Sequence, residues 1–507
     1  MKNKISAFAL AAILFTGCSL DEYPYGFYSE RNYYKTEADA QSATMYIYDA
    51  INYIEYSRAI VFLGGMNTDE LNPKGDATQS TKDLDSWSQN NFRSNVTMGN
   101  FFKYSYITIN RANAVIKNVP GMTTIDEKLR NRFTGEAYFM RGYSYFNLAR
   151  NFGRVPIHMD VVQTLDDTQA GLPATLDEMW GYIIEDFKKA SELLPYYAKP
   201  ETGRVDKAAA DGFLAKAYLY LASAKEYNVP QYKDMSFSVD DYYTKAEEAA
   251  AKVVNNPEQT TYHFDDDLMH IYDVDYPDGP EHIFIMSMDR TGESEGQYSK
   301  ISKMYIPYIS GGTVYLKQGA TDVMIPTHDG WSEYQTNIDF YNSYETGDLR
   351  KDWLICKEVY DASGAVVASY PGGGLSYPFC RKFIDPGFNG DKTSTKPYLF
   401  RYSDAALIYA EAAGPTAKAY ELVNYIRSRA GLGPLTPGLS KADFRKAVIK
   451  ERVYELAFEG NITYDLRRTG LLHTVAAVVG QGITNEEDIL FYPIPSIETD
   501  LNPNIQQ

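Results

Sequence analysis

The stretch from Leu399 to Gly470 limits the fold most, because its pattern is helix, helix, loop, helix and charged turn. In its second helix, apolar residues recur at helical spacing through Leu422, Val423 and Ile426. Gly431 follows and can supply the left-handed conformation that ends such a helix. The sequence therefore predicts packed helices in its last quarter.

The third helix of this stretch is predicted to run from Ser440 to Gly460. Ser440 can cap this helix. Asp443 stands at the third helical position, where a carboxylate can accept the reciprocal hydrogen bond of a capping box. Gly460 closes the pattern.

Three acids form a like-charge stripe on this helix. Glu451, Glu455 and Glu459 are spaced four apart, which destabilises a helix unless cations lie opposite. The cations available nearby are Arg427, Arg429, Arg467 and Arg468. One interpretation is a catalytic or anion-binding cluster; the favoured one is a buried ion-pair network that fastens the last helices together.

Several longer pieces of sequence carry a family resemblance. They are LFRYSDAALIYAEAAGPTAKAYELVNYIRSRAGLGP from Leu399, SKADFRKAVIKERVYELAFEG from Ser440, NITYDLRRTG from Asn461, GEAYFMRGYSYFNLARNFGRVPI from Gly135, GRVDKAAADGFLAKAYLYLASA from Gly203, GPEHIFIMSM from Gly279 and FYPIPSIETDLNPNIQQ from Phe491. In their order along the chain they resemble the SusD/RagB family of nutrient-binding outer-membrane lipoproteins over nearly the whole mature chain. The chain departs from the family at Ile462 and Thr463, where members usually carry an arginine and an aromatic residue. This departure leaves the pairing of Asp465 open.

The N-terminus has the order of a secretory signal. Lys2 and Lys4 precede an apolar run, Ile5 to Phe15, that is too short to span a bilayer as a permanent helix. The small residues before Cys18 resemble a lipobox, so residues 1–17 are predicted to be a signal peptide and Cys18 to be lipidated. An ordinary signal peptide with a chance cysteine is the alternative.

The resemblance implies a mainly α fold, in which tetratricopeptide-like helical hairpins form a scaffold for a large loop-rich, short-strand ligand face. No Ser/Pro-rich linker divides the chain, so residues 18–507 are predicted to form one unit. The scaffold is expected at about 30–260 and 398–470, and the ligand-binding insertions at about 60–95 and 261–397. Long irregular segments inside a compact protein are usually functional.

Six long helical patterns precede the second insertion. They cover about Thr36 to Tyr56, Gly99 to Val119, Ile125 to Phe152, Leu176 to Leu194, Lys207 to Tyr227 and Asp240 to Asn255. Thr175 with Glu178 forms a predicted capping box for the fourth pattern.

Aromatic residues in the two insertions are the candidate ligand contacts. The chain has 44 Tyr, whose rings have an apolar face and a polar rim, and a sugar ring offers the complementary C–H face and hydroxyl groups. The predicted platforms are Trp87 and Trp331, with Tyr305, Tyr308 and Tyr315 beside them and Asn67, Asp69 and Glu70 as polar contacts. Packing in the core is the alternative for each.

Catalytic and metal motifs give little support to an enzyme. The sequence shows no HExxH, no metal-spaced cysteines, no phosphate loop and no nucleophile elbow, so no cofactor is expected. An acidic run could hold structural calcium, although its spacing does not match an EF-hand loop: Asp265, Asp266, Asp267, Asp273, Asp275 and Asp278. Cys356 and Cys380 could bridge or stay reduced.

The resemblance implies a non-catalytic, surface-exposed lipoprotein of the outer membrane. Such a protein binds glycan and delivers it to a SusC-like TonB-dependent barrel, and Asp21 with Glu22 resembles a surface-export signal. The formal charge of -18 makes nucleic acid an unfavourable partner. The alternatives are a peptide or another nutrient as cargo, a helical-repeat scaffold that binds only proteins, and a surface hydrolase.

Overall fold

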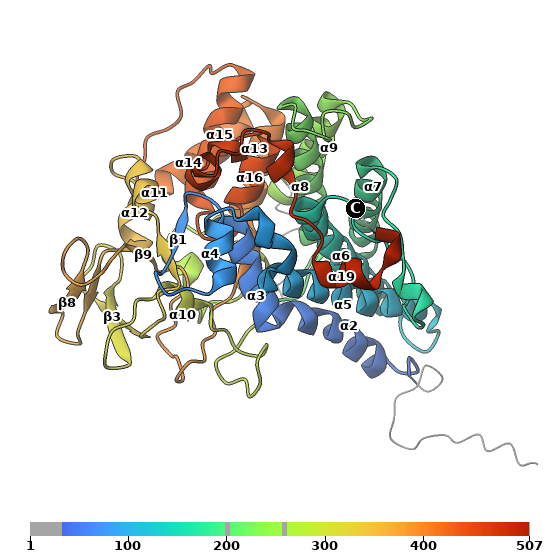
Figure 1. Ribbon diagram of the computed structural model, residues 1–507, viewed down its shortest axis with the longest axis horizontal. Helices are drawn as coiled ribbons and strands as arrows, with labels where there is room; N and C mark the ends of the chain where they lie inside the picture. The colour runs from blue at the N-terminus through green and yellow to red at the C-terminus, as the bar shows by residue number, and fades with distance from the viewer. Residues whose placement is uncertain (1–32, 198–202, 256–260, 506–507) are drawn as a thin grey trace, which may run out of the picture.

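The computed structural model describes residues 33–197, 203–255 and 261–505 (Figure 1). The predicted signal peptide, residues 1–17, and the predicted lipidation site, Cys18, lie outside these ranges. No helix within them is long and apolar enough to cross a membrane.

Long helices form the scaffold, and most of them occupy the right and upper parts of Figure 1. They are α2 (Glu37–Asn52), α3 (Ile54–Val61), α5 (Val96–Asn118), α6 (Glu127–Phe152), α7 (Leu176–Leu193), α8 (Lys207–Glu226), α9 (Val239–Val254), α13 (Tyr402–Ala413), α14 (Ala417–Arg429), α15 (Lys441–Glu455) and α16 (Ile462–Arg468). Successive helices from α5 to α9 pack side by side, and α13 packs on α9. The predicted mainly helical fold of hairpins is confirmed.

The boundaries of five of the six long helical patterns that precede the second insertion agree with the structure to within three residues. The first pattern, Thr36 to Tyr56, is split into α2 and α3 because Tyr53 leaves the helical conformation at ψ 138°. At α7, the Thr175 hydroxyl accepts from the Glu178 N–H at 3.1 Å, as predicted. The Glu178 carboxylate accepts instead from the Ala174 N–H at 2.7 Å.

Gly212 allows α8 to approach the small sheet beside it. A Cβ atom on Gly212 would lie 2.1 Å from the ring of Phe400. Phe400 belongs to β10 (Tyr398–Arg401), which pairs antiparallel with β2 (His282–Ile285). The scaffold is thus joined directly to the region that follows it in sequence.

The remaining strands gather at the left of Figure 1. They are β1 (Leu71–Pro73), β3 (Thr313–Lys317), β4 (Met324–His328), β5 (Tyr334–Thr336), β6 (Ile355–Cys356), β7 (Glu358–Tyr360), β8 (Val366–Ser369) and β9 (Phe379–Cys380). The largest sheet has the order β4-β3-β7-β8, and β1 pairs antiparallel with β5. The pairing of β1 with β5 brings the two insertions together.

Short helices complete the described chain. They are η1 (Phe62–Met66), α4 (Gln79–Asp85), η2 (Gln89–Ser94), η3 (Val119–Gly121), η4 (Asp166–Thr168), η5 (His270–Tyr272), α10 (Ile301–Tyr305), α11 (Ile338–Ser343), α12 (Leu349–Trp353), η6 (Leu472–Thr474), α17 (Ala476–Gly480), α18 (Glu487–Leu490), α19 (Ser496–Leu501) and η7 (Pro503–Ile505).

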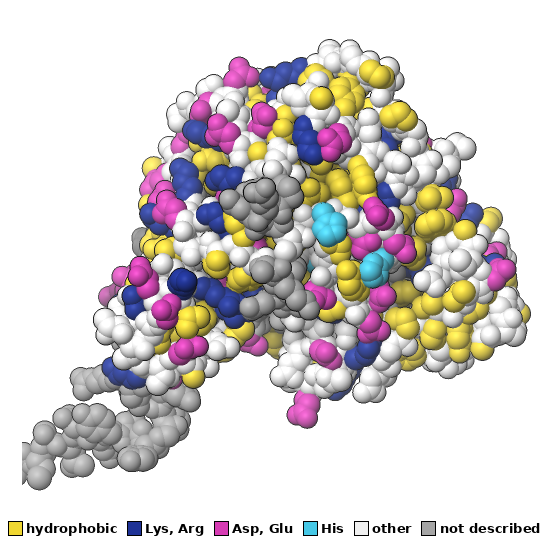
Figure 2. Space-filling view, turned by 180° about the vertical axis from the view of Figure 1, so that it is seen from behind, with side chains coloured by type: hydrophobic (Ala, Val, Ile, Leu, Met, Phe, Trp, Pro, Cys, Tyr) yellow, Lys and Arg dark blue, Asp and Glu magenta, His cyan; other side chains and the backbone are white. Residues whose placement is uncertain are grey.

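The reverse view shows how the surface differs between the two regions. Hydrophobic side chains gather at the strand-rich end, where Val366, Val367 and Val323 are each about half exposed (Figure 2). Acidic and basic side chains are interspersed over the helical part.

Helix α15 begins as predicted and ends earlier than predicted. The Ser440 hydroxyl accepts from the Asp443 N–H at 3.1 Å and donates to its carboxylate at 2.7 Å. The helix ends at Glu455, not at Gly460. Phe458, at φ 65°, turns its N–H out of the helix to Glu70, which accepts at 2.9 Å.

The acid stripe forms a buried ion-pair network. Glu451 pairs with Arg350 at 2.7 Å and with Arg427 at 3.0 Å. Glu455 contacts Arg401 at 2.8 Å. Three more pairs belong to the network: Arg429 with Glu455 at 2.8 Å, Arg401 with Glu459 at 2.9 Å and Lys382 with Glu459 at 2.7 Å. The interpretation as a fastening network is confirmed.

Two of the four predicted cations serve other partners. Arg468 pairs with Glu411 and with Asp465, and Arg467 lies over the ring of Tyr492 at 4.5 Å. The sequence analysis did not name three further cations of the network: Arg350 on α12, Lys382 after β9 and Arg401 at the end of β10.

Asp465 is paired despite the departure from the family pattern at positions 462 and 463. It contacts Arg468 at 2.8 Å and Arg452 at 3.3 Å. Burial alone would raise the pKa of Asp465, but the two guanidinium groups hold it below its usual value.

The two cysteines are free and point to opposite sides of one ladder. In the β6–β9 pair, Ile355 lies opposite Cys380, and Cys356 lies opposite Phe379. Directly opposed residues share a face and neighbours alternate, so the two sulfur atoms face apart. Cys380 accordingly packs in the main core, whereas Cys356 packs against a smaller cluster that contains Phe379.

Candidate ligand-binding site

Trp331 lies between two surface hollows, and it lines both of them. The first, which we call the helix-side hollow, has a volume of about 440 Å³. Its walls come from α3, η1, α4, α5, α10, β5 and the segments just before α4 and β5: Glu55, Arg58, Ala59, Phe62, Thr78, Ser80, Thr81, Val96, Thr97, Asn100, Met304, Trp331, Glu333 and Tyr334.

The second, the sheet-side hollow, lies across the same ring and has a volume of about 420 Å³. Its walls are Lys74, Asp76, Pro307, Tyr308, Gly330, Trp331, Ser332, Gln335, Gly374, Leu375, Ser376, Tyr377 and Phe379. Both hollows join the first insertion to the second.

Backbone hydrogen bonds hold the Trp331 loop in place. The N–H of Trp331 donates to the carbonyl of Lys303 at 2.7 Å, and that of Ser332 donates to Ile306 at 3.0 Å. Gly330 makes the close approach possible, since a Cβ atom there would lie 1.9 Å from the Ile306 carbonyl oxygen. The ring is therefore presented on a fixed backbone.

The hollows combine exposed rings with polar groups. Tyr308 is 70% exposed and Trp331 is 36% exposed. Lys74 links the walls, since its ammonium lies 3.4 Å from Glu333 and 3.7 Å from Asp76. Aromatic faces beside a few placed polar groups are typical of sites that bind small polar ligands.

Two of the predicted aromatic contacts are instead core residues. Trp87 is 2% exposed, its indole N–H donates to the Asn67 carbonyl at 2.9 Å, and its ring stacks near Tyr492. Tyr305 is fully buried and stacks on Phe383 with ring centroids 5.2 Å apart. The prediction that these two rings contact ligand is wrong, because neither presents a face to solvent.

The predicted polar contacts are also engaged inside the protein. Asn67 is fully buried and accepts from the Thr463 hydroxyl at 2.6 Å. Glu70 is buried, and burial raises the pKa of Glu70 to about 8. Asp69 accepts from the Ala476 N–H at 3.1 Å, and burial raises its pKa. The prediction is wrong for Asn67 and Glu70, which are buried, whereas Asp69 is partly exposed and its contact with ligand stays a prediction.

Three predicted aromatic residues remain outside the core. Trp331 and Tyr308 line the hollows, and their role in binding stays a prediction. Tyr315 is half-buried on β3 opposite Pro326 and lines neither hollow.

Sequence reasoning missed most of the wall. Arg58, Lys74, Glu333 and Tyr377 come from separate segments, and no local motif marks them. The pairing of β1 with β5 is what assembles them, and that pairing has no signature in a three-residue strand.

The acidic run, considered above for calcium, is occupied by protein contacts. Asp265 contacts His270 at 2.9 Å, Asp266 accepts from the Tyr425 hydroxyl, and Asp275 contacts Arg290 at 2.7 Å. Within the described ranges, no group of three His, Cys, Asp or Glu residues could hold a metal ion.

Comparison with known proteins agrees with this architecture. A crystal structure of a SusD homolog from Bacteroides thetaiotaomicron superimposes with a TM-score of 0.77 at 22% identity, over 95% of this chain and 98% of that one. A laminarin binding SusD-like protein superimposes with a TM-score of 0.73 at 23% identity, over 93% and 99% of the two chains. The fold is that of SusD-like proteins.

Sequence matches lead to the family itself. A model of the SusD family matches residues 280–507, and a model described as starch-binding, associating with outer membrane, matches residues 29–219. The SusD-like protein P2 of Formosa agariphila is 26% identical, over 100% of this chain and 99% of that protein. The two family models and the SusD-like relatives together support the SusD/RagB family for this chain.

Proposed function

We propose that the protein is a non-catalytic glycan-binding lipoprotein, and that an oligo- or polysaccharide lies across Trp331 with sugar rings in both hollows. The observation that carries the proposal is the exposed indole ring, held on a fixed loop between two hollows of about 440 and 420 Å³. The family and a laminarin binding relative of the same fold support it.

The chemistry of the walls suits a sugar chain. The C–H face of a pyranose ring stacks on an aromatic plane, and Trp331 and Tyr308 offer such planes. The surrounding side chains of Glu333, Lys74 and Tyr377 can exchange hydrogen bonds with hydroxyl groups. Solvent-exposed stacking gives modest affinity, which a protein that passes its ligand on requires.

The cellular part of the proposal places the protein on the outer face of the outer membrane. Lipidation at Cys18 would anchor it there, and a SusC-like TonB-dependent barrel would receive the ligand. The family description, starch-binding associating with outer membrane, supports this location. Capture without cleavage suits such a role, since the sugar must reach the transporter intact.

A peptide cargo is the second candidate, because the formal charge of -18 attracts cationic peptides. The two cargoes respond differently to salt. Stacking on Trp331 is insensitive to ionic strength, whereas charge-driven peptide binding weakens as salt rises.

The test is affinity electrophoresis of lipid-free protein beginning at Ser19, in gels that contain plant, starch, fungal or mucin polysaccharides. We expect one class to retard the protein. Trp331→Ala should weaken binding at least about tenfold, or ~1.4 kcal/mol, with an unchanged melting temperature. Tyr46→Ala, which removes an exposed ring on α2, is the control. Unaltered affinity in Trp331→Ala would remove the ring from the site.

A further inference from the structure

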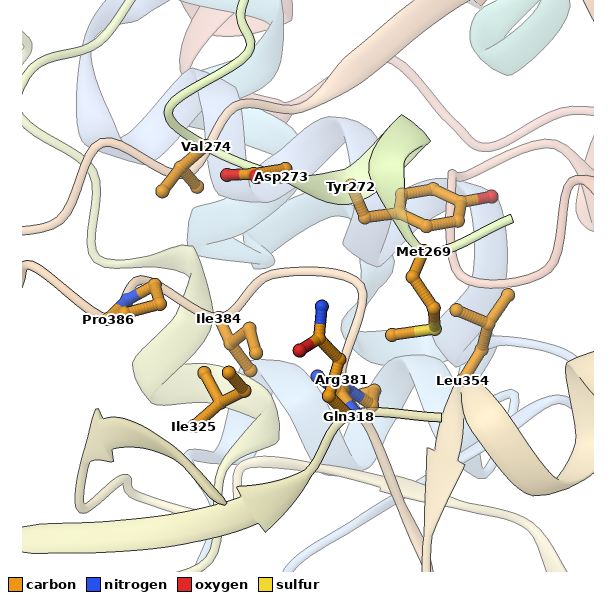
Figure 3. Close-up of a pocket in the computed structure, with 10 residues that line it drawn as sticks. All are labelled: Met269, Tyr272, Asp273, Val274, Gln318, Ile325, Leu354, Arg381, Ile384 and Pro386. Carbon is orange, nitrogen blue, oxygen red and sulfur yellow. The ribbon is translucent and has the colours of Figure 1, made fainter. Parts of the chain in front are cut away.

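A small pocket lies apart from Trp331 and shares no lining residue with either hollow. It has a volume of about 90 Å³ and lies between η5, the β3–β4 hairpin and the segment after β9 (Figure 3). Its walls are mainly apolar and include Met269, Val274, Ile325, Leu354 and Ile384. The pocket is not part of the proposed glycan site.

One wall of this pocket contains the guanidinium group of Arg381, which is 4% exposed. Its Nη1 donates to the Lys317 carbonyl, and its Nε has no hydrogen-bond partner within the described residues. It makes no ion pair with those residues, and burial lowers its pKa. A buried charge without a counter-charge is costly.

Each of the other buried arginines in the described chain has either a carboxylate partner or an aromatic face beside it. Arg141, for example, is bidentate to Asp186 at 2.8 and 2.7 Å. Arg150 has no carboxylate but lies over the ring of Tyr464 at 3.6 Å. Arg381 has neither a carboxylate nor an aromatic face among the residues that the structure describes.

We propose that this pocket binds a small monocarboxylate with a short apolar body. The carboxylate accepts hydrogen bonds from Arg381, and the apolar part packs against Ile325, Ile384 and Leu354. Ligand pockets for larger molecules measure roughly 300–1,000 Å³, so a pocket of about 90 Å³ admits only a few non-hydrogen atoms.

The surroundings favour a single negative charge. Only one cation lines the pocket, and the exposed carboxylate of Asp273 lies in its wall. Asp273 would repel a doubly charged sulfate or phosphate more strongly than a carboxylate. The amide of Gln318, also in the wall, can donate a second hydrogen bond.

The same chemistry can come from two sources. One is a free short-chain acid, and the other is a carboxylate carried as a substituent on a larger molecule whose body stays outside the pocket. Both place the same group at Arg381.

The experiment is isothermal titration of the lipid-free protein at constant ionic strength. The probes are propionate and butyrate, with propionamide as a neutral probe of matched shape. We expect saturable binding of the acids, and at least tenfold weaker binding of propionamide. If neither propionate nor butyrate binds, an oligosaccharide with carboxyl substituents should bind, and its methyl ester should not. Absence of binding by both kinds of carboxylate would overturn the proposal.

Variants locate the binding. Arg381→Met removes the charge and keeps most of the volume, and it should abolish binding of the acids. Arg154→Met is the matched control, because Arg154 bonds only to carbonyls of a distant loop, at Pro173 and Ala174. Ile325→Trp fills the pocket with a larger side chain and leaves Arg381 in place. It should also abolish binding of the acids. Acid binding that survives in both Arg381→Met and Ile325→Trp would contradict the assignment.

Discussion

Trp87 donates its indole N–H to the backbone carbonyl of Asn67 at 2.9 Å, inside the core. This bond ties the segment after α4 to the segment after η1. The two tryptophans predicted as platforms thus have opposite surroundings, since Trp331 presents its ring to solvent.

We therefore expect Trp87→Phe to destabilise the protein. The change leaves the Asn67 carbonyl without its buried donor and opens space near Tyr492, at a cost of about 2–4 kcal/mol. Chemical denaturation measures the loss, and glycan affinity of the folded variant should be unaltered. A variant as stable as the wild type would contradict the assignment of Trp87 to the core.

The buried carboxyl group of Glu70 should make the free energy of unfolding depend on pH. Its folded pKa is about 8, so the folded state keeps a proton that the unfolded state releases near pH 4.5. Stability contributed by that proton is complete below about pH 4.5 and is lost as the pH rises toward 8. Each pH unit in that window corresponds to about 1.4 kcal/mol at most.

Glu70→Gln should remove this dependence. The variant should exceed the wild type in free energy of unfolding by a few kcal/mol at pH 8, and the difference should shrink toward pH 5. Denaturation midpoints across this range measure it. Glu248→Gln, at an exposed position of α9, is the control and should leave the profile unchanged. A constant offset between Glu70→Gln and the wild type would exclude titration of Glu70.

Close backbone contact makes Gly64 sensitive to substitution. A Cβ atom there would lie 2.2 Å from the carbonyl oxygen of Gly460. Gly64→Ala should therefore cost about 3 kcal/mol or more in the free energy of unfolding, because backbone rather than a flexible side chain must move. Gly75→Ala is the matched control, since nothing lies within 4 Å of its Cβ position. Equal melting temperatures for the two variants would refute the argument.

Arg401 should be the most sensitive single residue of the ion-pair network. It contacts Glu281, Glu455 and Glu459 at 3.0, 2.8 and 2.9 Å. Arg401→Met would leave these buried carboxylates short of cations and should destabilise the protein by about 3–5 kcal/mol. Lys245→Met breaks the exposed pair with Asp241 and should cost no more than about 1 kcal/mol. Similar effects of the two changes would show that the buried network contributes little.

The two cysteines should remain reduced under oxidising conditions. Cys356 and Cys380 face opposite sides of the β6–β9 ladder, and burial raises the pKa of Cys356 to about 11. A thiol with so high a pKa is a poor nucleophile at neutral pH. Alkylation after unfolding of glutathione-treated, lipid-free protein should modify both thiols. If neither thiol is alkylated because the two have formed a disulfide, the β6–β9 pairing must have broken, and the prediction is contradicted.

The helices could be predicted from the sequence because each carries its own boundary signals. The Ser440 cap and the Thr175 cap are local, and both appear as expected. The acid stripe was readable because Glu451, Glu455 and Glu459 recur at intervals of four, although α15 contains Glu451 and Glu455 but not Glu459. Of the four predicted cations, Arg427 and Arg429 pair with these acids. Arg350 and Arg401, which were not predicted, pair with them as well.

The candidate site could not be predicted in the same way. Trp87 and Trp331 both occur in irregular stretches, and residue type alone does not tell a core ring from an exposed one. What distinguishes them is the fold: the Phe62–Phe92 segment turns Trp87 inward onto Tyr492, whereas three backbone hydrogen bonds hold the 330–332 loop at the surface.

The fixed loop under Trp331 has a kinetic consequence. A side chain on so constrained a backbone has little conformational freedom to lose when a ring stacks on it, so association needs no prior ordering of the loop. Departure, likewise, does not wait for a segment to open. A ligand at this ring would therefore exchange on the timescale of unstacking, and any long residence would have to come from a second protein that covers it.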